Sequence, residues 1–318
     1  MTLALCTLSH SPLIGVNQPA PDVVAEVDGA LARAREHVRA FSPDLAVIFG
    51  PDHFNGVFYD MLPPFCVGAG AESIGDWRTS AGPLAVDTEA ARTIHRQALA
   101  AGLDLAVSER MQVDHGIAQP LEFLFGSIDA VPVVPVFVNC AAPPLGPTER
   151  IRLLGEAVGR AVSVSGRRVL LIGSGGLSHD PPIPALEGAS PEVAERLIAG
   201  RNPDEDTVAT RVARVVATAQ ELAAGTSDRA PLAPEWDAEV METLARGRLS
   251  EFDSWSPEDF AAEAGNAAHE VRTWIAAFAA LGTAGAYRVT STYYRPIPEW
   301  IAGFAIMTAV VDEQKVTR

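Results

Sequence analysis

The sequence has few cysteines, no long apolar run and no N-terminal targeting pattern. Three cysteines occur in 318 residues. None forms a CxxC pair, which argues against a disulfide framework or a zinc ribbon and favours a reducing compartment. No run reaches the roughly 18 apolar residues that a membrane span requires. The first residues, MTLALCTLSHSP, lack the basic segment of a signal peptide. These absences predict a soluble, cytoplasmic protein without a membrane partner.

Basic residues are scarce as well. The chain has 24 lysines and arginines against 40 acidic residues, so its formal net charge is −16. Such a surface repels nucleic acid and anionic membranes, and neither is expected as a partner. The net charge does not exclude a small anionic ligand, since the charge around one site can differ in sign from the charge of the whole chain.

Motifs of two common enzyme classes are missing, although similar strings are present. The segment GSGGLSH at 173–179 has neither the lysine of a phosphate-binding loop nor the GxGxxG spacing. No GxSxG elbow of a serine hydrolase surrounds Ser174. Nucleotide binding and serine hydrolysis are therefore disfavoured. The glycines are instead expected to turn the backbone tightly and to aim His179 into a crevice.

Strand and helix patterns alternate through the first half of the chain. Short apolar runs predict strands at Leu3–Leu8, Asp44–Gly50, Val131–Asn139 and Arg168–Gly173. Helical spacing predicts helices at Val23–Phe41, Asp87–Ala101 and Pro147–Val162. This alternation favours an α/β three-layer sandwich with a mainly parallel or mixed central sheet. Prolines inside the third apolar run limit its pairing, so we expect that strand near an edge or a bulge.

The second half is more polar and more helical. Residues 185–234 predict helices laid over the core as an insertion, partly mobile around 200–206. Additional C-terminal helices are expected at Trp236–Gly247 and Ala267–Leu281, and late strands at Arg288–Tyr294 and Gly303–Asp312. With no internal repeat, residues 1–318 are predicted to form a single domain.

Four histidines stand in loops, where binding residues concentrate. His10, His53 and His179 each follow a predicted strand, and His115 lies in the loop MQVDHGIAQP. The carboxyl ends of strands in an open α/β sheet form the crevice in which ligands bind. Acid–base catalysis alone needs one or two such groups, so four histidines favour a metal site.

A carboxylate on an apolar helix completes the candidate set. Glu270 begins the helical segment HEVRTWIAAFAALG, and a charge on a buried helix requires a cationic partner. Glu235 and Glu239 are alternative carboxylates, and His269 is either a supporting neighbour or exposed. Two histidines and one carboxylate suit zinc or iron(II), and the residues alone leave that choice open.

Several motifs together resemble a known family. They are LSHSPL at 8–13, FSPDLAVIFGPDHFNGVFYDMLPPFC at 41–66, MQVDHGIAQPLEFL at 111–124, GSGGLSHDPP at 173–182, and the C-terminal HEVRTWIAAFAA and YYRPIPEWIAGF. Over nearly its whole length the chain resembles the class III extradiol dioxygenases, the superfamily of the protocatechuate 4,5-dioxygenase catalytic subunit. The resemblance implies iron(II)-dependent cleavage of a catechol with O2 to a ring-opened 2-hydroxy-6-oxo-dienedioate. The expected substrates are 3-(2,3-dihydroxyphenyl)propionate and 2,3-dihydroxycinnamate.

The resemblance also divides the candidate residues by role. It implies that His10, His53 and Glu270 bind Fe(2+). It further implies that His179 is the proton acceptor and His115 the proton donor.

Other expectations concern supporting residues and rival functions. Asp114 and Asp180 adjoin the two catalytic candidates and are expected to orient them by hydrogen bonding. Arg295 is a candidate contact for a substrate carboxylate. We expect a homo-oligomer that binds a small aromatic substrate and O2. The alternatives are a zinc-dependent hydrolase or amidase on a similar scaffold, and a non-catalytic subunit of a dioxygenase complex.

Overall fold

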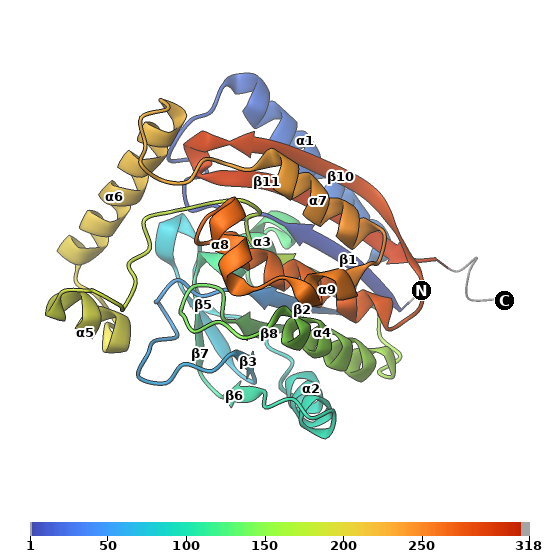
Figure 1. Ribbon diagram of the computed structural model, residues 1–318. Coiled ribbons are helices and arrows are strands. Elements are labelled where there is room, and N and C mark those ends of the chain that lie inside the picture. Colours follow the sequence, from blue (N-terminus) through green and yellow to red (C-terminus); the bar gives the residue numbers. More distant parts are fainter. Residues whose placement is uncertain (1, 313–318) are drawn as a thin grey trace.

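The computed structural model describes residues 2–312 and has a mixed eight-stranded sheet at its centre (Figure 1). Its strands are β1 (Leu3–Leu8), β2 (Leu45–Gly50), β3 (Phe65–Gly68), β6 (Ala106–Ser108), β8 (Val133–Val138), β9 (Val169–Ser174), β10 (Tyr287–Ile297) and β11 (Ala302–Val311). The strand order is β10-β11-β1-β9-β2-β8-β3-β6. Strands β1, β9, β2 and β8 are parallel, whereas β11 and β3 run antiparallel to their neighbours β1 and β8. The predicted α/β fold with a mixed sheet is confirmed.

Helices cover both faces of the sheet because successive strand residues point to opposite sides. Leu3 and Leu5 of β1 pack with one group of helices, whereas Ala4 and Cys6 pack with the other. The first group comprises α2 (Thr88–Ala100), α4 (Thr148–Ser163) and α9 (Val271–Gly282). The second comprises α1 (Pro21–Phe41) and α3 (His115–Phe125).

Helix α9 is buried along nearly its whole length. It packs against α4 and against strands β1, β2 and β9, which explains why its sequence is apolar on every side. Two glycines of α4 allow the close approach. A Cβ at Gly155 would lie 2.1 Å from the carbonyl oxygen of Ala276, and one at Gly159 would lie 2.3 Å from that of Ala280.

Strand β8 lies inside the sheet between β2 and β3, so the expected edge position was wrong. Its proline is tolerated because of the direction in which the missing N–H would point. The N–H of Val133 donates to Ala85, outside β2, and Pro135, two residues further on, faces the same side. The pairing of β8 with β3 extends from Val138 to Val136 and does not include Pro135. Pro135 therefore removes no bond to β2.

A small second sheet was not anticipated. Strands β4 (Ala71–Ile74), β5 (Ala81–Pro83) and β7 (Met111–Val113) pair in the order β5-β4-β7. The connection between β4 and β5 contains the short 3-10 turn η1 (Asp76–Arg78). Strand β7 leads directly into α3, so this sheet brings η1 beside the start of that helix.

The remaining helices follow β9. The polar segment forms α5 (Pro191–Ala199) and α6 (Glu205–Ala223), which lie at one end of the molecule, at the left in Figure 1. The other elements are α7 (Pro234–Ala245), η2 (Leu249–Ser254), α8 (Pro257–Ala264), η3 (Ala268–Glu270) and η4 (Pro298–Trp300). The predicted helical character of 185–234 is confirmed, and its mobility stays a prediction. None of the helices in the described chain combines the length and the apolar character of a membrane span.

Candidate active site

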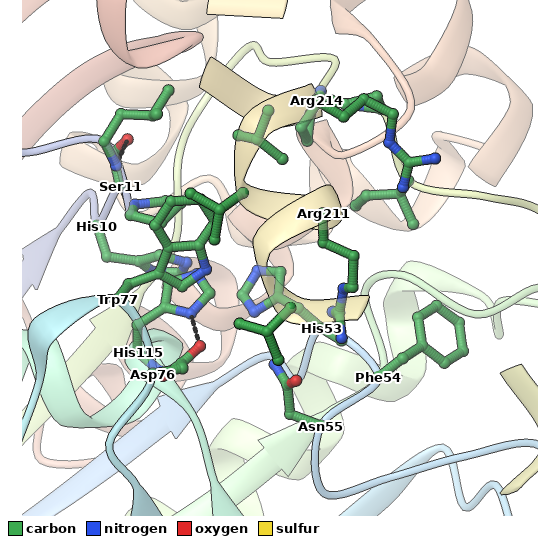
Figure 2. Close-up of a pocket in the computed structure, with 18 of the residues that line it drawn as sticks. His10, Ser11, His53, Phe54, Asn55, Asp76, Trp77, His115, Arg211 and Arg214 are labelled. Carbon is green, nitrogen blue, oxygen red and sulfur yellow. Dashed lines mark hydrogen bonds and ion pairs between the residues drawn. The ribbon is translucent and has the colours of Figure 1, made fainter. Parts of the chain in front are cut away.

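Three neighbouring central strands deliver the first candidate residues to one rim of the sheet. Strands β1, β9 and β2 are adjacent and parallel, so the loops that follow them meet at their carboxyl ends. These loops carry His10, His179 and His53. The rings of His10 and His53 lie 5.4 Å apart between centroids, and Figure 2 shows both facing one cavity. This arrangement agrees with the sequence prediction that these histidines share one crevice.

Hydrogen bonds at Nδ1 fix the orientation of the first two imidazoles. Nδ1 of His10 lies 2.9 Å from Ser174 Oγ, and Nδ1 of His53 lies 2.9 Å from Asp114 Oδ2. Both Nε2 atoms then face Glu270. Nε2 of His53 is 3.1 Å from Glu270 Oε1, and Nε2 of His10 is 3.7 Å from Glu270 Oε2. A metal-binding histidine usually makes a hydrogen bond through one ring nitrogen and binds the cation through the other. Here Nδ1 makes the hydrogen bond and Nε2 is left for a cation.

Glu270 is buried in η3, directly before α9. Its Oε2 accepts a 2.8 Å bond from the backbone N–H of Gly176. Burial alone would raise the pKa of Glu270, but the surrounding imidazoles, His179 first and then His10, hold it well below its usual value. Burial also lowers the pKa of His10 to about 3, so this imidazole is neutral. An ionised carboxylate beside neutral imidazole nitrogen is a donor set that fits a divalent cation.

The glycine-rich loop after β9 leaves room for this carboxylate. A Cβ at Gly175 would lie 2.6 Å from Glu270 Cβ and 2.9 Å from its carbonyl oxygen. The loop therefore packs directly on the acidic residue, and its glycines have a steric purpose. The alternative carboxylates Glu235 and Glu239 lie exposed near the start of α7 and do not line the cavity.

His115 and His179 complete the ring of imidazoles. Ring nitrogens of His10, His53 and His115 lie within 4.8 Å of one another, so His115 borders the same space. Nδ1 of His179 is 3.1 Å from the carbonyl oxygen of Leu177, and its Nε2 is 3.3 Å from Glu270 Oε1. Since a carbonyl only accepts, Nδ1 carries the proton there. In the neutral ring the lone pair is then on Nε2, toward the centre.

The partner of His115 is Asp76, a residue that the sequence did not reveal. Asp76 Oδ2 lies 2.6 Å from Nδ1 of His115, and Asp76 Oδ1 accepts a 2.7 Å bond from the backbone N–H of the same residue (Figure 2). Asp76 stands in η1, where Trp77 and Arg78 have positive φ angles of 46° and 68°. Such conformations are costly for residues other than glycine and often mark functional segments.

The two aspartates expected to orient the catalytic candidates contact other groups. Asp114 caps α3 through the N–H of Gly116 and bonds to the ring of His53 rather than to that of His115. Asp180 accepts bonds from the backbone and side chain of Asn266 at 3.1 and 3.0 Å, and it pairs with Arg229. Asp180 therefore fastens the loop that follows His179 and does not bond to its ring.

Two further candidates lie away from the cavity. The ring of His269 packs 5.4 Å from that of Phe260, between centroids, and burial lowers the pKa of His269 to about 3. Arg295 is at the surface, where Nη1 lies 2.8 Å from Glu26 Oε2 and Nη2 lies 3.9 Å from Asp22 Oδ2. The structure therefore contradicts Arg295 as a contact for a substrate carboxylate.

The cavity has a volume of about 510 Å³, which is within the range of small-molecule sites. Its inner end is formed by the four histidines and Glu270. Residues of α5 and α6 form another wall and include Arg196, Arg211 and Arg214. The site therefore combines four histidines and a buried carboxylate at one end with a cationic wall.

Comparisons with known proteins identify similar proteins along nearly the whole chain. The family described as the catalytic LigB subunit of aromatic ring-opening dioxygenase matches residues 4–305. A protein from Rhodococcus jostii (strain RHA1), named 2,3-dihydroxyphenylpropionate/2,3-dihydroxicinnamic acid 1,2-dioxygenase, is 58% identical over 98% of this chain and 100% of its own length. A relative of the same name from Azotobacter vinelandii is 52% identical, over 97% of this chain and 99% of its own length. A solved structure of an uncharacterized Escherichia coli K12 protein superposes with a TM-score of 0.48 at 12% identity, covering 96% of this chain and 98% of that chain.

Proposed function

Because the chain belongs to the family of catalytic LigB subunits of aromatic ring-opening dioxygenases, we propose that its substrate is 3-(2,3-dihydroxyphenyl)propionate, with 2,3-dihydroxycinnamate as a second substrate. The ring opens beside the two hydroxylated carbons and both atoms of O2 enter the product, a 2-hydroxy-6-oxo-dienedioate. The observation that carries the proposal is the convergence of His10, His53 and Glu270 on one cavity that His115 and His179 also border.

We propose that His10, His53 and Glu270 hold iron(II). Two histidines and one carboxylate on one side of an open site form the donor set of non-haem iron(II) oxygenases. When bound, iron(II) supplies Lewis acidity toward the catechol oxygens and the one-electron chemistry that dioxygen requires. Ser174 and Asp114 keep the two imidazoles in the orientation that presents Nε2.

His179 is proposed to accept a proton from the substrate. Phenolic hydroxyls titrate near pH ~10 in water, so a positioned base is needed at neutral pH. The carbonyl of Leu177 keeps the proton of the neutral ring on Nδ1, which leaves Nε2 as the accepting atom. That atom already faces the centre of the site, 3.3 Å from Glu270.

His115 is proposed to donate a proton to the oxygen that departs when the O–O bond breaks. Asp76 accepts both the backbone and the ring N–H of His115. It thereby holds the ring in place, with the proton of Nδ1 directed at the carboxylate. Asp76 is thus a positioning residue that acts through His115.

A zinc-dependent hydrolase or amidase is the second candidate, favoured by the same donor set. Metal replacement separates the two functions. Protein purified without oxygen and loaded with iron(II) should consume O2 and form a yellow product from the catechol in equal amounts. Activity with zinc alone, or no ring-opened product from any catechol in a panel, would overturn the proposal.

Variants test the assignment of roles. His10→Ala and Glu270→Ala should lose iron, because each removes a ligand. His115→Ala and His179→Ala should keep iron and lose turnover. Full iron occupancy in His10→Ala would show that the ligand set is wrong. The homo-oligomer stays a prediction that light scattering on the purified protein checks.

A further inference from the structure

One wall of the cavity is cationic, whereas His10, His53 and Glu270 form the proposed metal-binding end. Arg196 of α5 and Arg211 and Arg214 of α6 all line the cavity, in a chain whose formal net charge is −16. Figure 2 shows the Arg211 side chain extending from α6 toward His53 and Phe54. Arg211 and Arg196 are half-buried, whereas Arg214 is exposed.

These arginines lack the acidic partners that arginines nearby have. Within residues 2–312, no carboxylate oxygen lies within 4.0 Å of a guanidinium nitrogen of Arg196, Arg211 or Arg214. In contrast, Arg201 pairs with Asp60 at 2.6 Å. Burial lowers the pKa of Arg211, and the neighbouring Arg196 lowers it further by repulsion. An anion beside Arg211 would relieve both costs.

Arg211 is connected to the metal-binding end through His53. Its Nη2 donates a 3.2 Å bond to the carbonyl oxygen of His53, while Nε2 of the same histidine lies 3.1 Å from Glu270. One residue thus connects the two ends of the cavity. A catechol with its hydroxyls at the metal-binding end projects the substituent of the adjacent ring carbon away from that end.

The surface between the two ends suits an aromatic ring and a short carbon chain. Val208, Val212 and Val215 line the cavity from the same face of α6 as Arg211. Phe54 lines it from the loop after β2. The guanidinium uses one N–H group on His53 and retains others for a ligand. The planar guanidinium group matches the two oxygens of a carboxylate. An arginine already paired with Asp or Glu would not need such a ligand.

We propose that Arg211, with Arg196 beside it, binds the side-chain carboxylate of the substrate and selects catechols that carry a short carboxyalkyl group next to the hydroxyls. This inference rests on the proposed function. The proposed carboxylate contact is then Arg211, which lines the cavity, and not Arg295, which lies at the surface. Helix α6 would therefore determine substrate specificity.

The first test compares two substrates that differ in the carboxylate. Arg211→Met should raise KM for 3-(2,3-dihydroxyphenyl)propionate about 10- to 100-fold, the range of a lost charge-assisted hydrogen bond. The same variant should leave KM for 3-propylcatechol unchanged, since that substrate lacks the carboxylate. Arg211→Lys should recover part of the loss, because it keeps the charge without the fork. Arg295→Met is the matched control and should behave as wild type with both substrates.

The second test needs no turnover, and its comparison of acid with amide is made on the wild-type protein. 3-Phenylpropionate has the carboxylate but no hydroxyls, so it binds independently of the ring-opening reaction. It should raise the Tm of the wild-type protein, and the uncharged 3-phenylpropanamide should not. Arg211→Met should abolish the shift.

The outcomes separate the two proposals. Equal losses for both substrates in Arg211→Met, or equal Tm shifts with acid and amide in the wild type, would overturn the carboxylate site. A carboxylate-dependent Tm shift in a protein that cleaves no catechol would instead overturn the proposed function and leave the anion site standing.

Discussion

Replacing Asp76 by Asn tests how the acid of the reaction is held. Asp76 accepts from two donors of one residue, the backbone N–H of His115 at 2.7 Å and its ring Nδ1 at 2.6 Å. An amide keeps the shape but has one accepting atom where the carboxylate has two. The backbone donor cannot change, so the amide NH2 group turns toward the ring. Nδ1 must then become an acceptor, and the proton moves to Nε2.

The expected cost follows from these two bonds. The smallest expected loss of kcat corresponds to losing the charge-assisted hydrogen bond to the ring. The largest corresponds to losing the whole contribution of general acid catalysis. Asp76→Asn should therefore lower kcat about 10²- to 10⁴-fold. KM and iron content should stay near the wild-type values, because Asp76 contacts neither the proposed ligands nor Arg211.

Steady-state oxygen consumption together with iron analysis measures both effects. Glu72→Gln is the matched control, since Glu72 is exposed on β4, the strand that leads to η1. A kcat of Asp76→Asn within about twofold of wild type would refute the idea that this carboxylate positions His115. A parallel loss of iron would show that η1 acts on the metal-binding end instead.

The remaining predictions concern metal binding and packing. Burial opposes protonation of His53, but Asp114 and Glu270 outweigh it and hold the pKa of His53 well above its usual value. A cation must therefore displace a proton from the metal-free protein. Its affinity should rise between about pH 6 and about pH 8 in a competition titration with a chelator, and a flat profile would contradict this. Gly175→Ala should destabilise the fold by about 1–3 kcal/mol through overpacking against Glu270 and lower the iron content. Gly146→Ala, which has nothing within 4 Å of the added Cβ, should do neither, as thermal unfolding and metal analysis will show. Phe278→Ala should cost about 3–5 kcal/mol of unfolding free energy in urea, since Phe278 is fully buried in α9. A loss below about 1 kcal/mol would mean that α9 repacks.

The sequence was most informative where one physical signal dominates. Strands buried on both faces leave nearly continuous apolar runs, so β1, β2 and β9 were predicted almost to the residue. Glu270 was found because a charge on a helix as apolar as α9 has few explanations. The histidine loops were found because parallel strands bring their carboxyl ends to one rim.

The misses share a different cause, which is contact between distant short segments. Strands β4, β5 and β7 have three or four residues each, too few to show a period. Without that sheet, nothing indicates that Asp76 meets His115. Asp114 was expected to orient its neighbour in sequence, but it contacts the ring of His53. Arg211 was hidden in a polar helix whose position over the site depends on tertiary packing.

The separation of the site along the chain has a thermodynamic consequence. The proposed ligands His10, His53 and Glu270 reach one another only after β1, β2, β9 and the start of α9 have packed together. A cation that requires all of them therefore binds the complete native chain and not a partly folded one. Its binding energy adds to folding stability, by about 2.7 kcal/mol when the free ion is at 100 times its Kd. Metal availability would thus set the stability of the folded protein as well as its activity.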